Sequence, residues 1–113
     1  MELPFKVLEG KLYIDQKLID LPEQVDQVLL INDVIVYRLK LTGIKVFNRN
    51  IGAYSFTGEL LWQIPEIESK ASFKSYDKMY IDEQGRLIAC NYIGSNYIVD
   101  LQNGSITYVS FTK

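Results

Sequence analysis

The chain has 113 residues, of which 48% are hydrophobic and 23% are charged. This length predicts one domain with its own core, and the composition excludes a disordered chain. The formal net charge of −2 is too small to indicate a particular partner, and it lacks the strong basic excess typical of nucleic-acid-binding domains.

Short runs of alternating apolar and polar residues, separated by turn residues, fill nearly the whole chain. This pattern is typical of β-strands joined by hairpins. No run shows a helical period, and residues 65–72 are predicted to form a loop. We expect ten strands, at about residues 5–8, 11–15, 26–31, 34–39, 50–56, 59–64, 74–81, 86–92, 96–101 and 105–111.

Three of the turns contain a glycine that recurs at a nearly constant interval. Gly10, Gly58 and Gly104 lie 48 and then 46 residues apart, a period typical of repeat proteins. It divides a single domain, residues 1–113, into a half repeat at about 5–22 and repeats at about 26–65 and 74–111. Residues two apart share one face of a strand. We therefore expect the apolar residues two and four positions after each glycine to bury the same face in every unit: Leu12, Ile14, Leu60, Trp62, Ile106 and Tyr108.

The hairpin from Asn50 to Trp62 resembles the final hairpin of the pyrroloquinoline-quinone-type β-propeller repeat. There an alternating strand leads into a Thr-Gly turn and an apolar strand that ends in Trp. Residues 80–87 are similar to the inner hairpin of many propeller blades. The resemblance implies four antiparallel strands per unit, but no quinone chemistry. A closed propeller needs about four blades, and this chain has about two and a half units. We therefore expect an all-β antiparallel meander of about ten strands in blade-like hairpins, forming a half-barrel, a sandwich or an incomplete propeller.

The residue types present limit the chemistry of the chain. Histidine is absent, which removes the usual general base near neutral pH and the commonest transition-metal ligand. The single cysteine, Cys90, cannot form an internal disulfide, and it reads as a small buried residue. We predict no catalytic residue, no metal site and no cofactor, and hence no enzyme. A carboxylate pair such as Glu66 and Glu68 remains an alternative.

Charge is distributed unevenly along the chain. Residues 1–33 hold seven acidic and three basic residues, whereas residues 34–50 hold four basic and no acidic ones. The basic segment contains aromatic residues, a mixture that can bind single-stranded nucleic acid, but it is a weak signal in an acidic chain. The acidic segment surrounds a proline-containing connection, and an exposed acidic loop suits a basic protein partner. We therefore predict Asp20, Glu23 and Asp26 as partner-binding residues.

The hypothesis that these features favour is a non-catalytic protein-binding module. Its most concrete form is a small bacterial immunity protein that neutralises a basic toxin domain. Two alternatives remain: a propeller-like structural fragment that self-assembles through its open edges, and a carboxylate-dependent hydrolase or carbohydrate-binding module that uses Trp62. The N-terminus lacks a secretory pattern, and no apolar run approaches the roughly 18 residues of a membrane span. A cytoplasmic protein with no membrane association is therefore expected.

Overall fold

The computed structural model describes residues 3–43 and 45–111. In these ranges the chain is all-β, as predicted, and the structure contains no helix. The strands are β1 (Phe5–Leu8), β2 (Lys11–Ile14), β3 (Lys17–Leu18), β4 (Val25–Ile31), β5 (Val34–Leu39), β6 (Ile51–Tyr54), β7 (Leu60–Gln63), β8 (Tyr76–Ile81), β9 (Leu87–Asn91), β10 (Ser95–Val99) and β11 (Ile106–Phe111).

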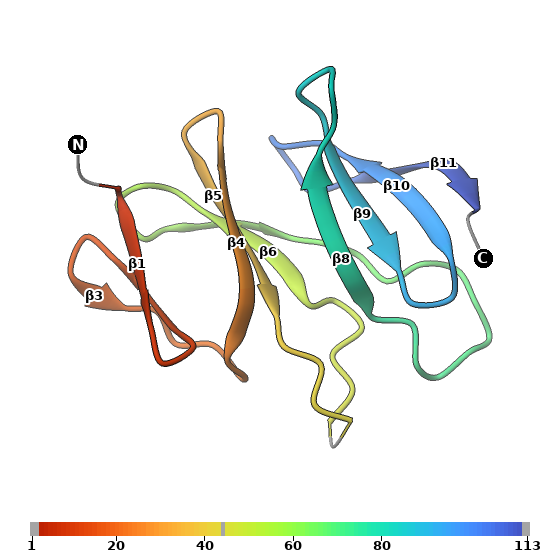
Figure 1. Ribbon diagram of the computed structural model, residues 1–113, viewed down its shortest axis with the longest axis horizontal. Helices are drawn as coiled ribbons and strands as arrows, with labels where there is room; N and C mark the ends of the chain where they lie inside the picture. The colour runs from red at the N-terminus through yellow and green to blue at the C-terminus, as the bar shows by residue number, and fades with distance from the viewer. Residues whose placement is uncertain (1–2, 44, 112–113) are drawn as a thin grey trace.

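The strands form three open antiparallel sheets that follow one another along the chain (Figure 1). The N-terminal sheet has the order β1-β2-β3, the central sheet β4-β5-β6-β7, and the C-terminal sheet β8-β9-β10-β11. Each strand pairs only with its neighbours in the sequence, so every sheet is a meander. None of the sheets closes into a barrel, which confirms the expectation of an open all-β architecture.

The ten predicted strands are all present, with ends that differ by one or two residues, and β3 is an addition. This strand of two residues follows a turn at Asp15 and Gln16, which both have positive φ, 52° and 65°. Positive φ is uncommon for residues with a side chain, and glutamine is not among those enriched there. The turn therefore has no clear sequence signal, and β3 could not be predicted from it.

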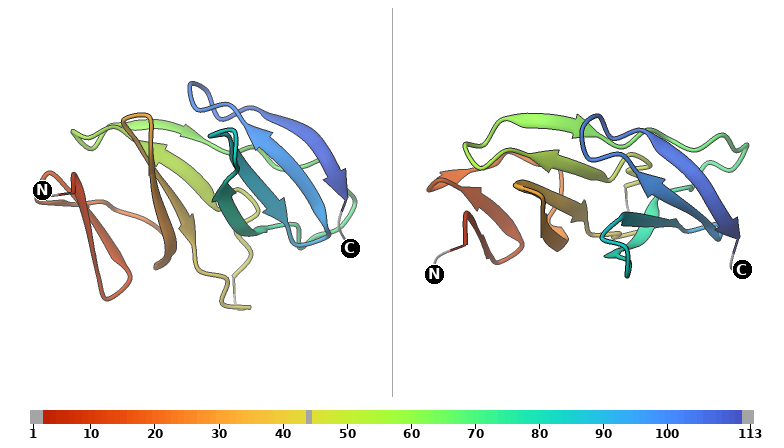
Figure 2. Two further views of the ribbon diagram at one scale, coloured as in Figure 1. Left: turned by 45° about the horizontal axis from the view of Figure 1, so that its top comes forward. Right: turned by 90° about the horizontal axis from the view of Figure 1, so that it is seen from above.

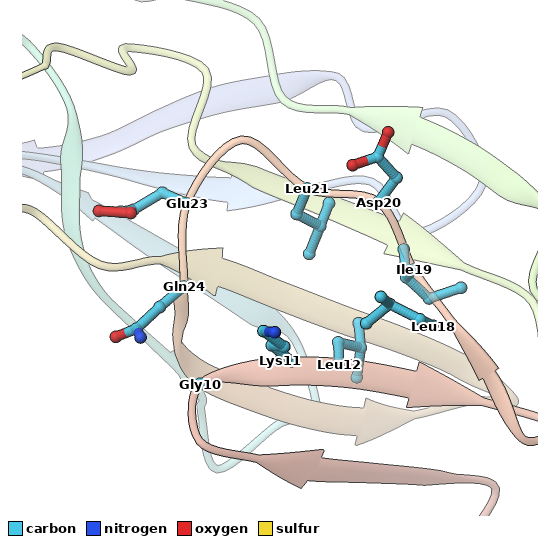
Figure 3. Close-up of a pocket in the computed structure, with 9 residues that line it drawn as sticks. All are labelled: Gly10, Lys11, Leu12, Leu18, Ile19, Asp20, Leu21, Glu23 and Gln24. Carbon is cyan, nitrogen blue, oxygen red and sulfur yellow. The ribbon is translucent and has the colours of Figure 1, made fainter.

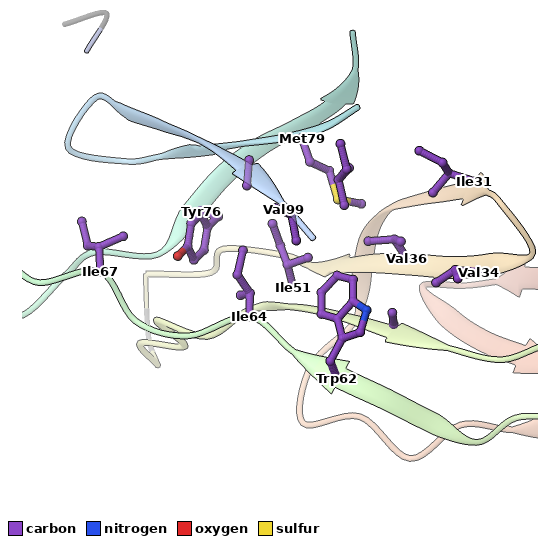
Figure 4. Close-up of a cluster of buried hydrophobic side chains, with 13 residues drawn as sticks. Ile31, Val34, Val36, Ile51, Trp62, Ile64, Ile67, Tyr76, Met79 and Val99 are labelled. Carbon is purple, nitrogen blue, oxygen red and sulfur yellow. The ribbon is translucent and has the colours of Figure 1, made fainter. Parts of the chain in front are cut away.

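The central sheet is covered on both faces, and its strand β5 is buried along its whole length. Figure 2 shows the N-terminal and C-terminal sheets on opposite sides of it. Leu12 and Ile14 of β2 pack with Ile35 and Tyr37 of β5 in the smaller core. The larger core lies between the central and C-terminal sheets (Figure 4), where the labelled side chains include Val36, Ile51, Trp62, Tyr76, Met79 and Val99.

The predicted burial after each turn glycine holds for the first hairpin and fails in part for the other two. Leu12, Ile14 and Trp62 are buried, but Leu60 is 58% exposed and Tyr108 57% exposed. In the β6–β7 hairpin the register shifts between Ala53 and Tyr54. This bulge breaks the alternation of faces along β7. Tyr108 is exposed because β11 is the last strand of the C-terminal sheet.

Side-chain amides connect the central sheet to the edge strand β8. Asn50 donates to the carbonyl of Tyr76 (2.7 Å) and accepts from the Tyr76 N–H (2.8 Å). Gln27 donates to the carbonyl of Met79 (2.7 Å) and accepts from its N–H at a longer 3.4 Å. Each amide therefore satisfies backbone groups at the β8 edge. This places the central and C-terminal sheets at a fixed distance from each other.

Buried tyrosines predict a loss of stability at high pH. Burial raises the pKa of Tyr37 to about 12, and it also raises the pKa of Tyr76 above the usual 10.0. Unfolded tyrosines ionise near pH 10, while these two stay neutral in the fold, so the unfolded state binds fewer protons above that pH. Their contribution to stability is complete below about pH 10 and is lost as the pH rises toward 12. We expect the free energy of unfolding to fall by about 1.4 kcal/mol per pH unit for each such tyrosine.

Urea denaturation at pH 9, 10 and 11 measures this slope. In Tyr37→Phe the free energy of unfolding should fall less steeply with pH, by the amount that one buried tyrosine contributes. An unchanged slope in this variant would show that Tyr37 does not cause the effect.

Candidate functional site

The described residues contain no group of three or more cysteine, aspartate and glutamate side chains placed to hold a metal ion. Every buried side-chain nitrogen and oxygen in residues 3–43 and 45–111 has a hydrogen-bond partner. The buried side chains of Asn50 and Asn91 and the half-buried side chain of Gln27 donate to backbone carbonyls. These hydrogen bonds give the three side chains a structural role.

Glu66 and Glu68, the carboxylates considered as an acid/base pair, are on the surface. Glu66 forms an ion pair with Lys74 at 3.6 Å, and both Glu66 and Glu68 are exposed. Asp82 instead closes the β8–β9 turn, where it accepts from the Arg86 N–H at 2.8 Å and from the Gln84 N–H at 3.0 Å. These hydrogen bonds, that from Arg86 first, lower the pKa of Asp82. Its role in the turn is structural.

Trp62 and Cys90 also take structural positions. Trp62 is 6% exposed and donates its indole N–H to the carbonyl of Leu101 at 2.8 Å. It therefore has no open ring face on which a sugar could stack. Cys90 is half-buried, more accessible than the sequence suggested, and burial raises the pKa of its thiol.

The pocket that contains predicted site residues lies beside the connection from β3 to β4 (Figure 3). We call it the acidic pocket. Its volume is about 300 Å³. Leu12 and Leu21 give it an apolar floor, and Asp20 and Glu23 stand on the connection above. The lining residues are Gly10, Lys11, Leu12, Leu18, Ile19, Asp20, Leu21, Glu23 and Gln24.

Backbone hydrogen bonds fix the connection at both of its ends. The N–H of Ile19 donates to the carbonyl of Leu12 (2.9 Å), and the N–H of Val25 donates to the carbonyl of Gly10 (2.8 Å). A third bond runs from the N–H of Lys40 to the carbonyl of Gln24 (2.8 Å). Because both ends are tied to neighbouring strands, the acidic pocket is formed before any partner binds.

The two carboxylates of the acidic pocket point in different directions. Figure 3 shows Asp20 and Glu23 at opposite ends of the connection, with Leu21 between them directed toward β2. Asp20 is exposed and Glu23 half-buried. Burial raises the pKa of Tyr54, and the Asp20 charge raises it further. Asp20 therefore lies near Tyr54 of the central sheet. Lys11 is the basic lining residue, so the acidic pocket keeps a net charge of −1.

The structure separates Asp26 from the other two predicted residues. Asp26 lies on β4, where its carboxylate binds the guanidinium of Arg38 at 3.1 Å. The Arg38 side chain is only 9% exposed, so Asp26 balances a nearly buried charge. It does not line the acidic pocket. Its position favours a structural role, and no local pattern indicates the pairing because Arg38 lies on the next strand.

Two of the basic residues of segment 34–50 bind groups of the same chain. Arg38 is paired as above, and Arg49 donates to the carbonyls of Ile64 (3.0 Å) and Gln63 (3.3 Å). Two of the four cations therefore bind atoms of the same chain. This weakens the argument for binding to nucleic acid.

One family profile matches the chain. It is described as "Domain of unknown function (DUF7957)", and it covers residues 4–111. No curated protein and no solved structure matches the chain. Within residues 3–43 and 45–111, no helix is long and apolar enough to cross a membrane.

Proposed function

The chain belongs to the DUF7957 family, and we propose that it is a non-catalytic protein-binding module whose acidic pocket receives a basic segment of a partner protein. The observation that carries this proposal is the pairing of a preformed apolar floor with two carboxylates at its edge. The family description names no function, so the proposal depends on the geometry of this pocket alone.

The pocket has the chemistry to bind the side chain of lysine or arginine. Such side chains combine a long apolar stem with a charged end. The stem can pack on the lining residues Leu18 and Leu21, while the charge reaches Asp20 or Glu23 at the rim. Because both ends of the connection are fixed by backbone hydrogen bonds, binding costs little ordering of the loop, which favours affinity.

Charges at an exposed rim act mainly on the rate of association and on the orientation of the partner. We therefore expect binding to weaken as salt concentration rises, because exposed charges are screened at distances beyond about 10 Å at 0.1 M salt. A basic toxin domain is the partner that the immunity-protein hypothesis specifies. The genes flanking this one test that form of the proposal, since a toxin-like gene beside it would supply a partner for direct measurement.

Charge reversal at the pocket tests the proposal. The tagged chain is expressed in its native cells, the co-purified proteins are identified, and binding to the purified partner is measured by calorimetry. We expect Asp20→Lys combined with Glu23→Lys to reduce affinity at least tenfold, which corresponds to about 1.4 kcal/mol.

The matched control combines Glu59→Lys with Glu83→Lys, which changes the net charge by the same amount at exposed sites outside the pocket. It should bind like the unchanged chain. Equal affinities of the two double variants would contradict the role of the acidic pocket. If the chain co-purifies with no protein at all, the proposal that it is a binding module fails.

A further inference from the structure

We infer that this chain associates head to tail with copies of itself, through pairing of β11 of one copy with the free edge of β1 of the next. This inference is independent of the acidic pocket. It depends on the two terminal sheets, each of which ends in an unpaired strand: β1 in the N-terminal sheet and β11 in the C-terminal sheet.

The strand edge that is free in β1 is paired with another strand at the equivalent position of the other two sheets. The glycine turns at Gly10, Gly58 and Gly104 show that the β1–β2 hairpin corresponds to the β6–β7 and β10–β11 hairpins. In the central sheet β6 pairs with β5, and in the C-terminal sheet β10 pairs with β9. The N-terminal sheet has no strand in this position. Alternate residues of β1 therefore direct their backbone N–H and C=O groups to an edge without a protein partner.

The edge of β11 lacks charge and proline, two of the features that usually prevent strand addition. Proteins protect edge strands with charged residues, with proline, with β-bulges or by keeping the strand short. β11 has one of these features, a bulge against β10 at Val109. β11 has six residues, Ile106–Phe111, with no charged residue and no proline. Val109 is 47% exposed and Phe111 55% exposed. By contrast β3, β4 and β8 each carry at least one charged residue, so β11 is the longest edge strand without charge.

Both edges carry apolar or aromatic side chains on the inner face of their sheets. Residues paired across a ladder point to the same face. Phe5 and Val7 pair with the buried Ile14 and Leu12, so they share the inner face of the N-terminal sheet. Tyr108 and Phe111 pair with Tyr97 and Ser95 on the inner face of the C-terminal sheet.

Tyr108 and Phe111 are three positions apart because of the bulge, whereas Phe5 and Val7 are two apart. An antiparallel β11–β1 pair would therefore place one aromatic residue of β11 directly beside Phe5 or Val7. Aromatic and β-branched cross-strand pairs of this kind are among the favourable ones. The only charge on either strand is Lys6, so no like charges oppose each other. The paired sheets would form one sheet of seven strands, from four in one copy and three in the next.

A contact between two different edges has a geometric consequence. Each copy has one β11 edge and one β1 edge, and the contact joins the two different edges. It is therefore repeated from copy to copy, and it ends only if a ring closes. The ladder is short, four residues on the β1 side, and small interfaces are weak. We therefore expect association that increases with protein concentration.

Sedimentation equilibrium of the full chain over a wide concentration range tests this inference. The average mass should rise with concentration beyond that of two chains. Val7→Lys blocks the β1 edge, and Val109→Lys blocks the β11 edge, because a lysine on an edge strand opposes strand addition. Each variant alone should stay at the mass of one chain. Leu60→Lys is the matched control, since it places a lysine at an exposed position of a third edge strand, β7, and should associate like the unchanged chain.

Mixing the two blocked variants gives the decisive result. Val7→Lys retains a free β11 edge and Val109→Lys retains a free β1 edge, so an equimolar mixture should form pairs and stop there. Trp62 fluorescence verifies that each variant is folded, and Leu8→Lys replaces Val7→Lys if the latter does not fold. A chain that remains monomeric at millimolar concentration overturns the inference. So does a dimer that only one of the two lysines disrupts, because that dimer would join two identical edges.

Discussion

Gly104→Ala is expected to lower the free energy of unfolding by about 2–5 kcal/mol, from two independent costs. Gly104 has a φ of +78°, and a Cβ atom added there would lie 2.6 Å from the Trp62 ring. The left-handed conformation costs alanine about 1–2 kcal/mol. Forcing the buried indole to move adds about 1–3 kcal/mol, as in other overpacked cores. The indole is also held by its hydrogen bond to Leu101, so it cannot rotate away freely.

Two other glycines separate these costs, because their φ angles are nearly the same. Gly85 has a φ of +76° with open space around its Cβ position, and Gly10 has a φ of +78° beside the Gln24 side chain. Gly85→Ala should show the conformational cost alone, about 1–2 kcal/mol. Gly10→Ala should be worse than Gly85→Ala, because the added Cβ would lie 2.8 Å from the Gln24 Cβ, which a change of rotamer cannot move.

Urea denaturation of the three variants at neutral pH measures these differences. The order of stability should be Gly85→Ala, then Gly10→Ala, then Gly104→Ala as the least stable. If all three variants lose the same stability, the contact between the Gly104 position and Trp62 does not constrain the fold. The packing of the β10–β11 turn on β7 would then be looser than the structure shows.

Asn50→Ala is expected to lower the free energy of unfolding by about 2–4 kcal/mol. Asn50 is fully buried, and its amide satisfies both the N–H and the carbonyl of Tyr76. Alanine removes the amide and leaves these two buried groups without their partner. A buried polar group that loses its partner costs about 1–3 kcal/mol. The substitution also removes a link between the central and C-terminal sheets.

The comparison for this prediction is Gln63→Ala. The Gln63 amide also donates to a backbone carbonyl, that of Arg49 at 2.9 Å, but it does so at an exposed position. Water can replace this bond, so we expect a loss below about 1 kcal/mol. Thermal unfolding followed by circular dichroism distinguishes the two variants. A loss at Asn50 no larger than that at Gln63 would mean that water or a backbone shift satisfies Tyr76.

Most strands of this chain could be predicted because their signals are local. Alternation of apolar residues marks each strand, and Asn103–Gly104 or Asp82–Gly85 mark the turns between them. β3 could not be predicted, since Gln16 in the turn before it has a positive φ, which is uncommon for glutamine. Leu60 was predicted to be buried but is exposed. The cause is a bulge in its hairpin, which depends on pairing across two strands.

Partner binding by Asp20, Glu23 and Asp26 stays a prediction, and the structure shows only where these residues lie. An excess of acidic residues around Pro22 indicated Asp20 and Glu23, which do line one pocket. The same reasoning included Asp26, which the fold pairs with Arg38 instead. Nothing in the local sequence distinguishes these three carboxylates. Their difference arises from which side chain lies opposite each of them in the folded chain.

The sequence by itself determined the all-β class, the succession of hairpins and the absence of histidine chemistry, because composition and short-range alternation act within a few residues. The tertiary structure decided which sheet faces are covered, which acids surround a pocket and which strand edges stay open. Those properties depend on contacts between residues far apart in the chain, such as Asn50 with Tyr76 and Trp62 with Leu101. These contacts set which side chains are buried and which strands pair, and no local sequence pattern encodes such contacts.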